Sequence, residues 1–312
     1  MWSYAFVEGR PVTTKGQWMN PLVFANMRLA KMGLITKKVE QPIFILGTGR
    51  SGTTILGIVM SMHRDIAFLN EPKALWHSVF PNEDLIGSYS RGDAKYIMTE
   101  KDSDASSIKK MHHIFGYYLS TVFSKRVLDK YPELVFRIPF LKSIFPDFKA
   151  IFLYRNGWDT AISSAGWSTI HGEQVKDETH NWWGVNNRKW KLLCDQVIAI
   201  DDELGQHSKQ ISAFENEVDK SIVEWIISMK YGMDVCKKYP KQIIGISYED
   251  LTSKPEETIA RIVKFCNLPN DNRLMGYAHR TLSPAPSKSP IALNPLLQAP
   301  FNRIMQEMGY AV

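Results

Sequence analysis

The chain has 312 residues, of which 44% are hydrophobic and 22% charged, and its formal net charge is +6. These values are ordinary for a globular protein with one large α/β domain or two small ones. The positive balance suits an anionic ligand, but no block of Lys and Arg with interleaved aromatic residues indicates nucleic acid.

The first forty residues are predicted to be an N-terminal extension. Within it, the segment from Trp18 to Ile35 is mildly amphipathic and basic. We expect it to pack onto the domain, and peripheral contact with a membrane surface is the alternative. No run of eighteen apolar residues predicts a membrane span, and no apolar stretch near Met1 resembles a secretory signal. The three cysteines form no C-x-x-C pair, which favours a reducing, cytoplasmic location, and the histidines show no metal-ligand spacing.

A glycine-rich loop follows the first predicted strand. The apolar run from Ile43 to Leu46 leads into the loop 47–54, and a helix is predicted over 53–62. This arrangement points backbone N–H groups at a phosphate. The spacing nearly matches the P-loop G-x-x-x-x-G-K-[ST], but Thr53 stands at the Lys position, and the cation is Arg50. An ordinary strand-to-helix turn is the alternative; the anion-site interpretation nominates Gly49, Arg50, Ser51, Gly52, Thr53 and Thr54.

Two further acidic and basic candidates follow in chain order. A second strand over 66–69 ends in Asn70-Glu71-Pro72, which places Glu71 at the same sheet edge as Arg50, although a surface Glu before a turn proline is the alternative. A mostly helical insertion is predicted over 72–134. After it, a strand over 135–138 contains Arg137, for which a salt bridge is an equal interpretation.

A second anion-binding motif is predicted where another buried strand ends. The apolar strand 150–154 is followed by Arg155, and the helix predicted over 158–165 carries Ser163 on its first turns. Both residues are expected at the edge that holds the loop. A Walker-type ATPase would end this strand with an Asp for Mg²⁺, whereas an Arg favours a second phosphate. Taken singly, a surface ion pair for Arg155 and simple packing for Ser163 are the alternatives.

The rest of the chain completes an α/β pattern. A second helical insertion over 164–217 holds Trp167, Trp182, Trp183 and Trp190, which belong either to the core or to an acceptor cleft. Tyr248 follows a strand, and a Ser- and Pro-rich loop over 280–290 precedes the last helix. The remaining predicted elements are a strand over 243–247 and helices around 180–200, 218–239, 254–266 (with Ser253 and Glu256 as a capping box) and 296–308. Strands alternating with helices predict a P-loop-type, mostly parallel sheet flanked by helices, in a single domain over 1–312.

Three segments resemble motifs of the sulfotransferases that use 3′-phosphoadenosine-5′-phosphosulfate (PAPS). The loop 45–54 resembles their 5′-phosphosulfate loop, in the Arg form typical of the tyrosylprotein and carbohydrate branches. The segment 150–164 is similar to their 3′-phosphate motif, with Arg155 and Ser163 at the matching places. The segment 246–268 resembles a tyrosine-acid-acid strand end followed by a helix. Together these motifs touch both ends of the region from about Ile43 to Met308.

The resemblance implies roles for individual residues. Glu71 lies where relatives place the base that removes the acceptor proton, which is chemistry that a carboxylate can perform. Arg50 and Arg137 are implied to stabilise charge on the leaving group, although relatives more often place Lys or His at Arg137. Tyr248 is implied to lie against adenine. The residues implied to close over the cofactor are Ser283 and Lys288.

The leading functional hypothesis is therefore transfer of a sulfuryl group from PAPS, without a metal, to a hydroxyl of a small-molecule, saccharide or lipid acceptor. A P-loop nucleotide or small-molecule kinase is one rival, which the absent Lys at Thr53 and the absent Asp at Arg155 disfavour. A non-catalytic nucleotide binder on the same fold is the other. The sequence leaves the acceptor and the oligomeric state open.

Overall fold

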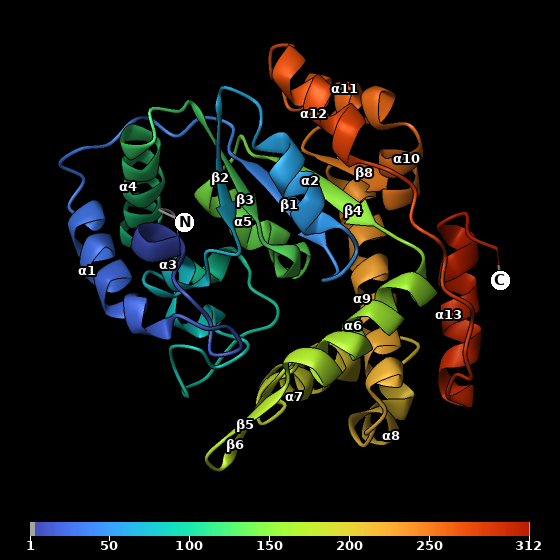
Figure 1. Ribbon diagram of the computed structural model, residues 1–312. Helices are drawn as coiled ribbons and strands as arrows, with labels where there is room; N and C mark the ends of the chain where they lie inside the picture. Colours follow the sequence, from blue (N-terminus) through green and yellow to red (C-terminus); the bar gives the residue numbers. More distant parts are fainter. Residues whose placement is uncertain (1–3, 312) are drawn as a thin grey trace.

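Five parallel strands form the central sheet of the computed structural model, which describes residues 4–311 (Figure 1). Their order is β2-β3-β1-β4-β8, with β1 in the middle. After β1, the chain forms β2 at one edge of the sheet and then β3 between β2 and β1. It then crosses to the other side of β1, where β4 and β8 follow. The strands are β1 Ile43–Gly47, β2 Ile66–Asn70, β3 Arg126–Lys130, β4 Lys149–Tyr154 and β8 Ile243–Ser247. Such a reversal beside β1 creates a crevice at the carboxyl ends of the strands, where α/β proteins bind ligands.

Both faces of the sheet are covered, and the sequence of β1 shows why. All five of its residues are buried; Phe44 and Leu46 join one hydrophobic cluster, and Ile43 and Ile45 join another. Successive side chains of a strand point to opposite faces, so a strand between two helical layers must be apolar throughout. Helices α2, α11 and α12 supply the second cluster, and α4, α5 and α9 pack in the first.

The helices follow the strands in a largely alternating order. The α-helices are α1 Asn20–Lys31, α2 Thr53–Met60, α3 Lys73–His77, α4 Ala105–Thr121, α5 Ile138–Ile144, α6 Gly157–His171, α7 Arg188–Gln196, α8 Ser208–Ser212, α9 Glu217–Lys238, α10 Tyr248–Ser253, α11 Pro255–Phe265, α12 Asn272–Thr281 and α13 Pro295–Glu307. Short 3₁₀ turns span Gln17–Met19, Pro81–Glu83, Glu100–Asp102, Pro132–Arg137, Ile198–Ile200 and Gly205–His207, and a π turn spans Tyr4–Glu8. Among residues 4–311, no helix combines the length and hydropathy needed to cross a bilayer.

The predicted fold class is confirmed, but several predicted elements are wrong. The strand expected over 135–138 is instead part of a 3₁₀ turn and α5, and the true third strand, β3, lies inside the expected insertion 72–134. The start of the helix expected over 180–200 is a small antiparallel sheet of β5 Glu173–Val175, β6 Glu178–Asn181 and β7 Gly184–Val185. The capping box is also wrong, because Lys254 is the N-cap of α11 and the Ser253 hydroxyl donates to the Glu249 carbonyl.

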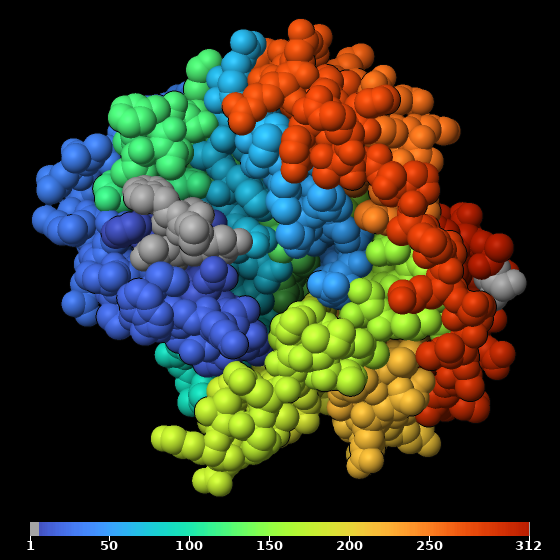
Figure 2. Space-filling view, in the orientation of Figure 1, coloured from blue at the N-terminus to red at the C-terminus, as the bar shows by residue number. Residues whose placement is uncertain are grey.

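The N-terminal extension packs along one flank of the molecule, where it appears blue in Figure 2. One stripe of α1, formed by Val23, Met27 and Ala30, is buried against the domain. Before α1, residues 9–14 reach the carboxyl edge of the sheet, where several of them line a cavity. The extension therefore forms part of the wall of this cavity.

A close approach of α9 to the sheet gives a stability prediction. A Cβ on Gly232 would lie 1.9 Å from the ring of Phe152, which is buried in β4. Gly232→Val is therefore expected to lower the free energy of unfolding by about 1–3 kcal/mol or more, because a packed core cannot absorb the added atoms. Gly166→Ala is the matched control, since nothing lies within 4 Å of a Cβ there. Gly166→Ala should leave the free energy of unfolding in urea unchanged or slightly higher. Equal losses of this free energy in both variants would contradict the close packing at Gly232.

Candidate active site

The loop between β1 and α2 adopts a phosphate-binding geometry. Gly47, Arg50 and Gly52 have φ angles of 149°, 69° and 94°, and a Cβ on Gly47 would lie 2.4 Å from the Leu153 carbonyl oxygen. Glycine alone tolerates such crowding together with positive φ. Because the N-cap of α2 is Gly52, no side chain caps the first turn of the helix. The first N–H groups of a helix without a side-chain cap can donate to a bound anion.

The Ser51 side chain faces inward, whereas the threonines of the loop face the crevice. The buried Ser51 hydroxyl donates to the Thr48 carbonyl at 2.6 Å, so this side chain shapes the loop, and only its backbone remains for an anion. Thr48, Thr53 and Thr54 line the cavity beside Gly49. A Cβ on Gly49 would lie 2.4 Å from the Trp182 ring, which fixes how closely the loop approaches the opposite wall.

The two motifs of the predicted nucleotide site meet at Ser163. Arg50 Nε lies 3.2 Å from the Ser163 hydroxyl oxygen, so the loop cation reaches the first turns of α6. Arg155 comes directly after β4, and its guanidinium lies 4.3 Å from the centroid of the Tyr248 ring. A Cβ on Gly52 would lie 2.3 Å from that same ring. Arg50 thus contacts Ser163, and Arg155 and Gly52 both lie against the Tyr248 ring, so the loop and the end of β4 are close together.

The Ser- and Pro-rich loop is anchored next to Arg155. Asp159 on α6 lies 3.3 Å from Arg155 Nη2, and its other carboxylate oxygen accepts a 2.6 Å hydrogen bond from the Lys288 backbone N–H. The Ser283 and Lys288 residues are exposed in an irregular segment between α12 and α13. The structure thus places this loop beside the predicted 3′-phosphate motif.

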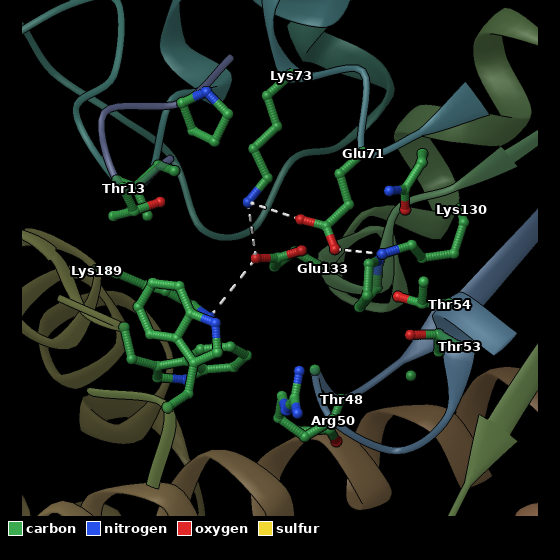
Figure 3. A pocket seen from close by; sticks show the side chains of 18 of the residues that line it. Thr13, Thr48, Arg50, Thr53, Thr54, Glu71, Lys73, Lys130, Glu133 and Lys189 are labelled. Carbon is green, nitrogen blue, oxygen red and sulfur yellow. Dashed lines mark hydrogen bonds and ion pairs between the residues drawn. The ribbon is translucent and has the colours of Figure 1, made fainter. Parts of the chain in front are cut away.

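A cavity of about 260 Å³ opens beside the phosphate loop (Figure 3). Its walls come from the N-terminal extension, the loop, the ends of β2 and β3, and the segment that contains Trp182. Trp167 and Trp182 line it as an edge-to-face pair with centroids 5.6 Å apart. Trp183 and Trp190, by contrast, are buried in the core, so two of the four tryptophans form the cleft wall and two form the core.

Glu71 projects into this cavity from a strained backbone position. Its φ angle is +53°, which is unusual for a residue with a side chain. Its N–H donates to the Lys130 carbonyl at 2.8 Å, and its carbonyl accepts from the Lys73 N–H at 2.7 Å. These bonds hold the conformation, and strain of this kind is concentrated at functional sites. The side chain remains 38% exposed, which leaves the carboxylate accessible to a substrate.

Glu71 is the first member of a chain of alternating charges. It forms ion pairs with Lys130 and, at 3.6 Å, with Lys73. Lys73 lies 3.3 Å from Glu133, and Lys189 lies 3.5 Å from Glu133. Lys189 also pairs with Glu224 at 2.6 Å, and the Trp182 indole N–H donates to Glu224 at 3.0 Å. All of these groups line the cavity, and Figure 3 labels Glu71, Lys73, Lys130, Glu133 and Lys189.

The charge network sets the protonation of its carboxylates. Burial alone raises the pKa of Glu71, but Lys130 and Lys73 outweigh it, so the pKa lies below its ordinary value. For Glu133, burial is likewise outweighed by Lys73 and Lys189, and the pKa falls far below its ordinary value of 4.5. Both carboxylates are therefore ionised at neutral pH.

The depressed pKa of Glu133 predicts how stability depends on pH. A carboxyl group with a lower pKa in the folded state stabilises the fold above its unfolded pKa and loses that contribution as the pH falls towards the folded pKa. Glu133→Gln is expected to lower the free energy of unfolding at neutral pH by about 3–5 kcal/mol, because it leaves two buried lysines short of a partner.

The difference in the free energy of unfolding between wild type and Glu133→Gln should become smaller as the pH falls below 4.5, the pKa of this carboxyl in the unfolded chain. Urea unfolding at a series of pH values measures it. Glu256→Gln, at an exposed position, is the matched control and should leave stability unchanged. A difference that stays constant with pH would contradict the role given to the Glu133 charge.

Arg137 requires a correction. It is 1% exposed and lies at the end of the 3₁₀ turn before α5, not on a strand. Its guanidinium donates to the backbone carbonyls of Tyr96, Lys95 and Glu83, and one nitrogen lies 3.5 Å from the Glu83 carboxylate. The structure thus gives Arg137 the buried salt-bridge environment that the alternative interpretation described and does not place it among the residues that line the cavity.

The sequence interpretation missed the lysines of the site. Lys130 ends β3 and stands opposite Ile45 of the central strand, at the edge where Glu71 and the phosphate loop lie. The run Arg126-Val127-Leu128-Asp129-Lys130 before Tyr131-Pro132 could have indicated a strand end. Lys73, Lys189, Glu133 and Glu224 lie far apart in the sequence, and no local pattern marks them.

The fold and this site define an α/β protein with a parallel sheet and a P-loop-type turn between β1 and α2. The sequence pattern described as "Sulfotransferase family" matches residues 42–272. The chain therefore belongs to the sulfotransferase family. Its assignment to the tyrosylprotein and carbohydrate branches stays a prediction.

Individual relatives are distant. An uncharacterized protein of Aquifex aeolicus (strain VF5) is 25% identical over 268 residues, which is 80% of this chain; the chain spans only 28% of the length of that relative. Sulfotransferase STF9 from Mycobacterium avium superposes with a TM-score of 0.52 at 14% identity, covering 94% of this chain and 84% of that one. The sulfotransferase domain from the curacin biosynthetic pathway gives a TM-score of 0.51 at 18% identity, covering 88% of this chain and 100% of that one. These two structures share the fold.

Proposed function

We propose that this protein transfers a sulfuryl group from PAPS to a hydroxyl of a small-molecule, saccharide or lipid acceptor. The observation that carries the proposal is the proximity of two cationic motifs at one edge of the sheet, since Arg50 contacts Ser163 and Arg155 lies over the Tyr248 ring beside Gly52. PAPS, when bound, supplies the activated sulfuryl group on its 5′-phosphate and carries a second phosphate on the ribose. Two separated cationic anchors match those two phosphates.

The loop serves the 5′ end of the nucleotide. The N–H groups from Gly49 to Thr54 and the Arg50 guanidinium hold the 5′-phosphate, as the uncapped N-terminus of α2 supports. The Thr48 hydroxyl is buried at the cavity wall, and among residues 4–311 it has no hydrogen-bond partner. A buried polar group of this kind fits a ligand oxygen. As negative charge develops on the leaving phosphate, the same donors stabilise it.

Arg155 and Ser163 serve the 3′-phosphate. The Arg155 side chain is only 14% exposed, and its buried Nε has no partner within the described part of the chain. This unmet donor supports a site for an anion that the protein itself does not supply. The Tyr248 ring lies against Arg155 and suits the adenine side, while Ser283 and Lys288 lie on the loop that Asp159 anchors beside Arg155.

Glu71 acts as the general base. Its lowered pKa keeps it ionised and able to accept the acceptor hydroxyl proton, and its exposed fraction faces the cavity between the phosphate loop and Trp182. Lys130 forms an ion pair with this carboxylate and also lines the cavity, so it orients the base and adds positive charge beside the phosphate loop. A kinase is disfavoured because Thr53 and Arg155 occupy the places of its Lys and Asp.

Transfer of label from sulfur-labelled PAPS tests the proposal directly. The protein is incubated with labelled PAPS, a chelator and an extract that contains phenols, saccharides and lipids. We expect labelled organic products with wild type and a strong loss with Arg50→Met, because that variant lacks the loop cation. Tight binding of 3′-phosphoadenosine-5′-phosphate without any labelled product would contradict the proposal and indicate a non-catalytic binder.

A further inference from the structure

Helix α1 carries a second apolar stripe, on the side that does not pack against the domain. Trp18, Leu22, Ala25, Leu29 and Met32 follow one another at intervals of four, three, four and three residues, and all five are exposed. Trp18 is 77% exposed, Leu22 is 53%, and Leu29 and Met32 are 62% each. This spacing keeps the five side chains on one helical face. A surface helix with one buried face normally has polar residues on its opposite, exposed face. The exposed apolar stripe therefore requires an explanation.

The stripe belongs to a larger apolar patch. Leu34 and Ile35, immediately after the helix, are 78% and 65% exposed. Six of the twelve large apolar side chains that are exposed among the described residues fall within positions 18–35. Phe123, which is 88% exposed, adjoins the end of this segment, because the Lys37 ammonium donates to the Ser124 carbonyl at 3.0 Å. We call residues 15–38 the basic apolar segment.

The charges around this patch are nearly all positive. Residues 9–39 contain Arg10, Lys15, Arg28, Lys31, Lys37 and Lys38 and no Asp or Glu. Lys109 and Lys110 are exposed on the neighbouring helix α4. Burial lowers the pKa of Lys31, and Lys110 and Arg28 lower it further, so these cations lie close enough to repel one another. Glu40, which pairs with Lys38 at 2.6 Å, is the nearest acid along the chain.

We propose that the basic apolar segment docks onto the surface of an anionic lipid bilayer. An exposed apolar helical face flanked by Lys and Arg is the arrangement that buries its apolar side chains at the acyl boundary and places its cations among anionic headgroups. A second copy of the chain is a poorer occupant. A symmetric dimer through α1 would set cation against cation with no acid in either segment to compensate.

Docking would place the cavity close to the membrane. Residues 9–14 line the cavity wall and continue directly into the segment, and the Val12 N–H donates to the Ser88 hydroxyl at 3.2 Å. The four Cα–Cα steps from Thr14 to Trp18 span at most about 14 Å. One wall of the cavity therefore stays near the headgroup layer whenever Trp18 is inserted.

Vesicle co-sedimentation tests this proposal without requiring any turnover. Wild type is mixed with vesicles of phosphatidylcholine alone and with vesicles of an equimolar mixture of phosphatidylcholine and phosphatidylserine, at low and high salt. We expect binding to the mixed vesicles that weakens at high salt, and little binding to phosphatidylcholine. The double variant Leu22→Gln/Leu29→Gln should bind at least about tenfold more weakly, and so should Lys15→Gln/Arg28→Gln.

The matched control is Ile170→Gln/Ile200→Gln, which removes two side chains that are 76% and 70% exposed elsewhere; it should bind the vesicles as wild type does. Unchanged thermal midpoints show that the variants fold. Failure to bind mixed vesicles, or equal loss in the control, overturns the proposal. So does a wild-type dimer in light scattering that Leu22→Gln/Leu29→Gln converts to monomer, because the stripe then binds a second copy.

Discussion

Glu71→Gln is expected to lower kcat by about 10²–10⁴-fold, the usual contribution of a positioned base. The amide has nearly the same shape as the carboxylate but cannot accept the acceptor proton. Affinity for 3′-phosphoadenosine-5′-phosphate should change little, because Glu71 faces the cavity and not Ser163 or Arg155. Steady-state kinetics and calorimetric titration with the nucleotide measure the two quantities separately.

Glu133→Gln provides the matched comparison for this prediction. It removes one negative charge from the same ion network and the same cavity wall. Its loss in kcat should stay within about tenfold, because Glu133 is held between two lysines and its side chain is only 12% exposed, against 38% for Glu71. Equal losses for the two variants would show that Glu71 acts through charge alone. An unchanged rate for Glu71→Gln would remove it from the mechanism.

Arg155→Met is expected to abolish discrimination between nucleotides with and without a 3′-phosphate. Charge-assisted hydrogen bonds contribute about 1.5–3 kcal/mol, so affinity for 3′-phosphoadenosine-5′-phosphate should fall about 10- to 100-fold. Affinity for adenosine 5′-phosphate should change little, because the loop donors at the other end remain. Calorimetric titration with each nucleotide gives the ratio of the two affinities.

Arg261→Met serves as the control, because Arg261 is exposed and its guanidinium donates to the Gly245 carbonyl at 3.2 Å. It should bind both nucleotides as wild type does. Arg155→Met could instead lower the affinity for both nucleotides equally. That result would show that the Arg155 guanidinium maintains the local structure through Asp159 and Tyr248 and does not bind the 3′-phosphate.

Strand ends were the most predictable part of this protein. The strands β1, β2, β4 and β8 were predicted to within one residue, because each is a short apolar run that ends at a glycine or a polar residue. Once such strands are placed in parallel, their carboxyl ends share one edge, and Arg50, Glu71 and Arg155 lie at that edge for this reason.

The third strand, β3, was missed because its sequence does not look buried. Asp129 is fully buried in it and accepts a hydrogen bond from the Trp76 indole at 2.8 Å, and burial raises the pKa of this carboxyl well above its ordinary value. The apolar run around Phe136 resembled a strand better, but Pro132 and Pro139 begin a 3₁₀ turn and a helix there.

Because β3 was not predicted, Lys130 at its end was not recognised either. Lys130 is the ion-pair partner of Glu71, the proposed base. The ion network joins residues from the ends of β2 and β3 to α7 and α9, and its members find one another only through the tertiary fold. A local pattern in one sequence does not indicate such long-range contacts. The roles of Glu71, Lys130 and the two arginines therefore stay predictions until the variants above are measured.

The most direct test of the account compares two nucleotides on the wild-type protein in the presence of a chelator. Calorimetric titration with 3′-phosphoadenosine-5′-phosphate should give tight binding, and titration with ATP should give much weaker binding that added Mg²⁺ does not improve. Tighter binding of ATP, or a requirement for Mg²⁺ in either titration, would contradict the claim that Arg50 and Arg155 hold two separate phosphates of one nucleotide.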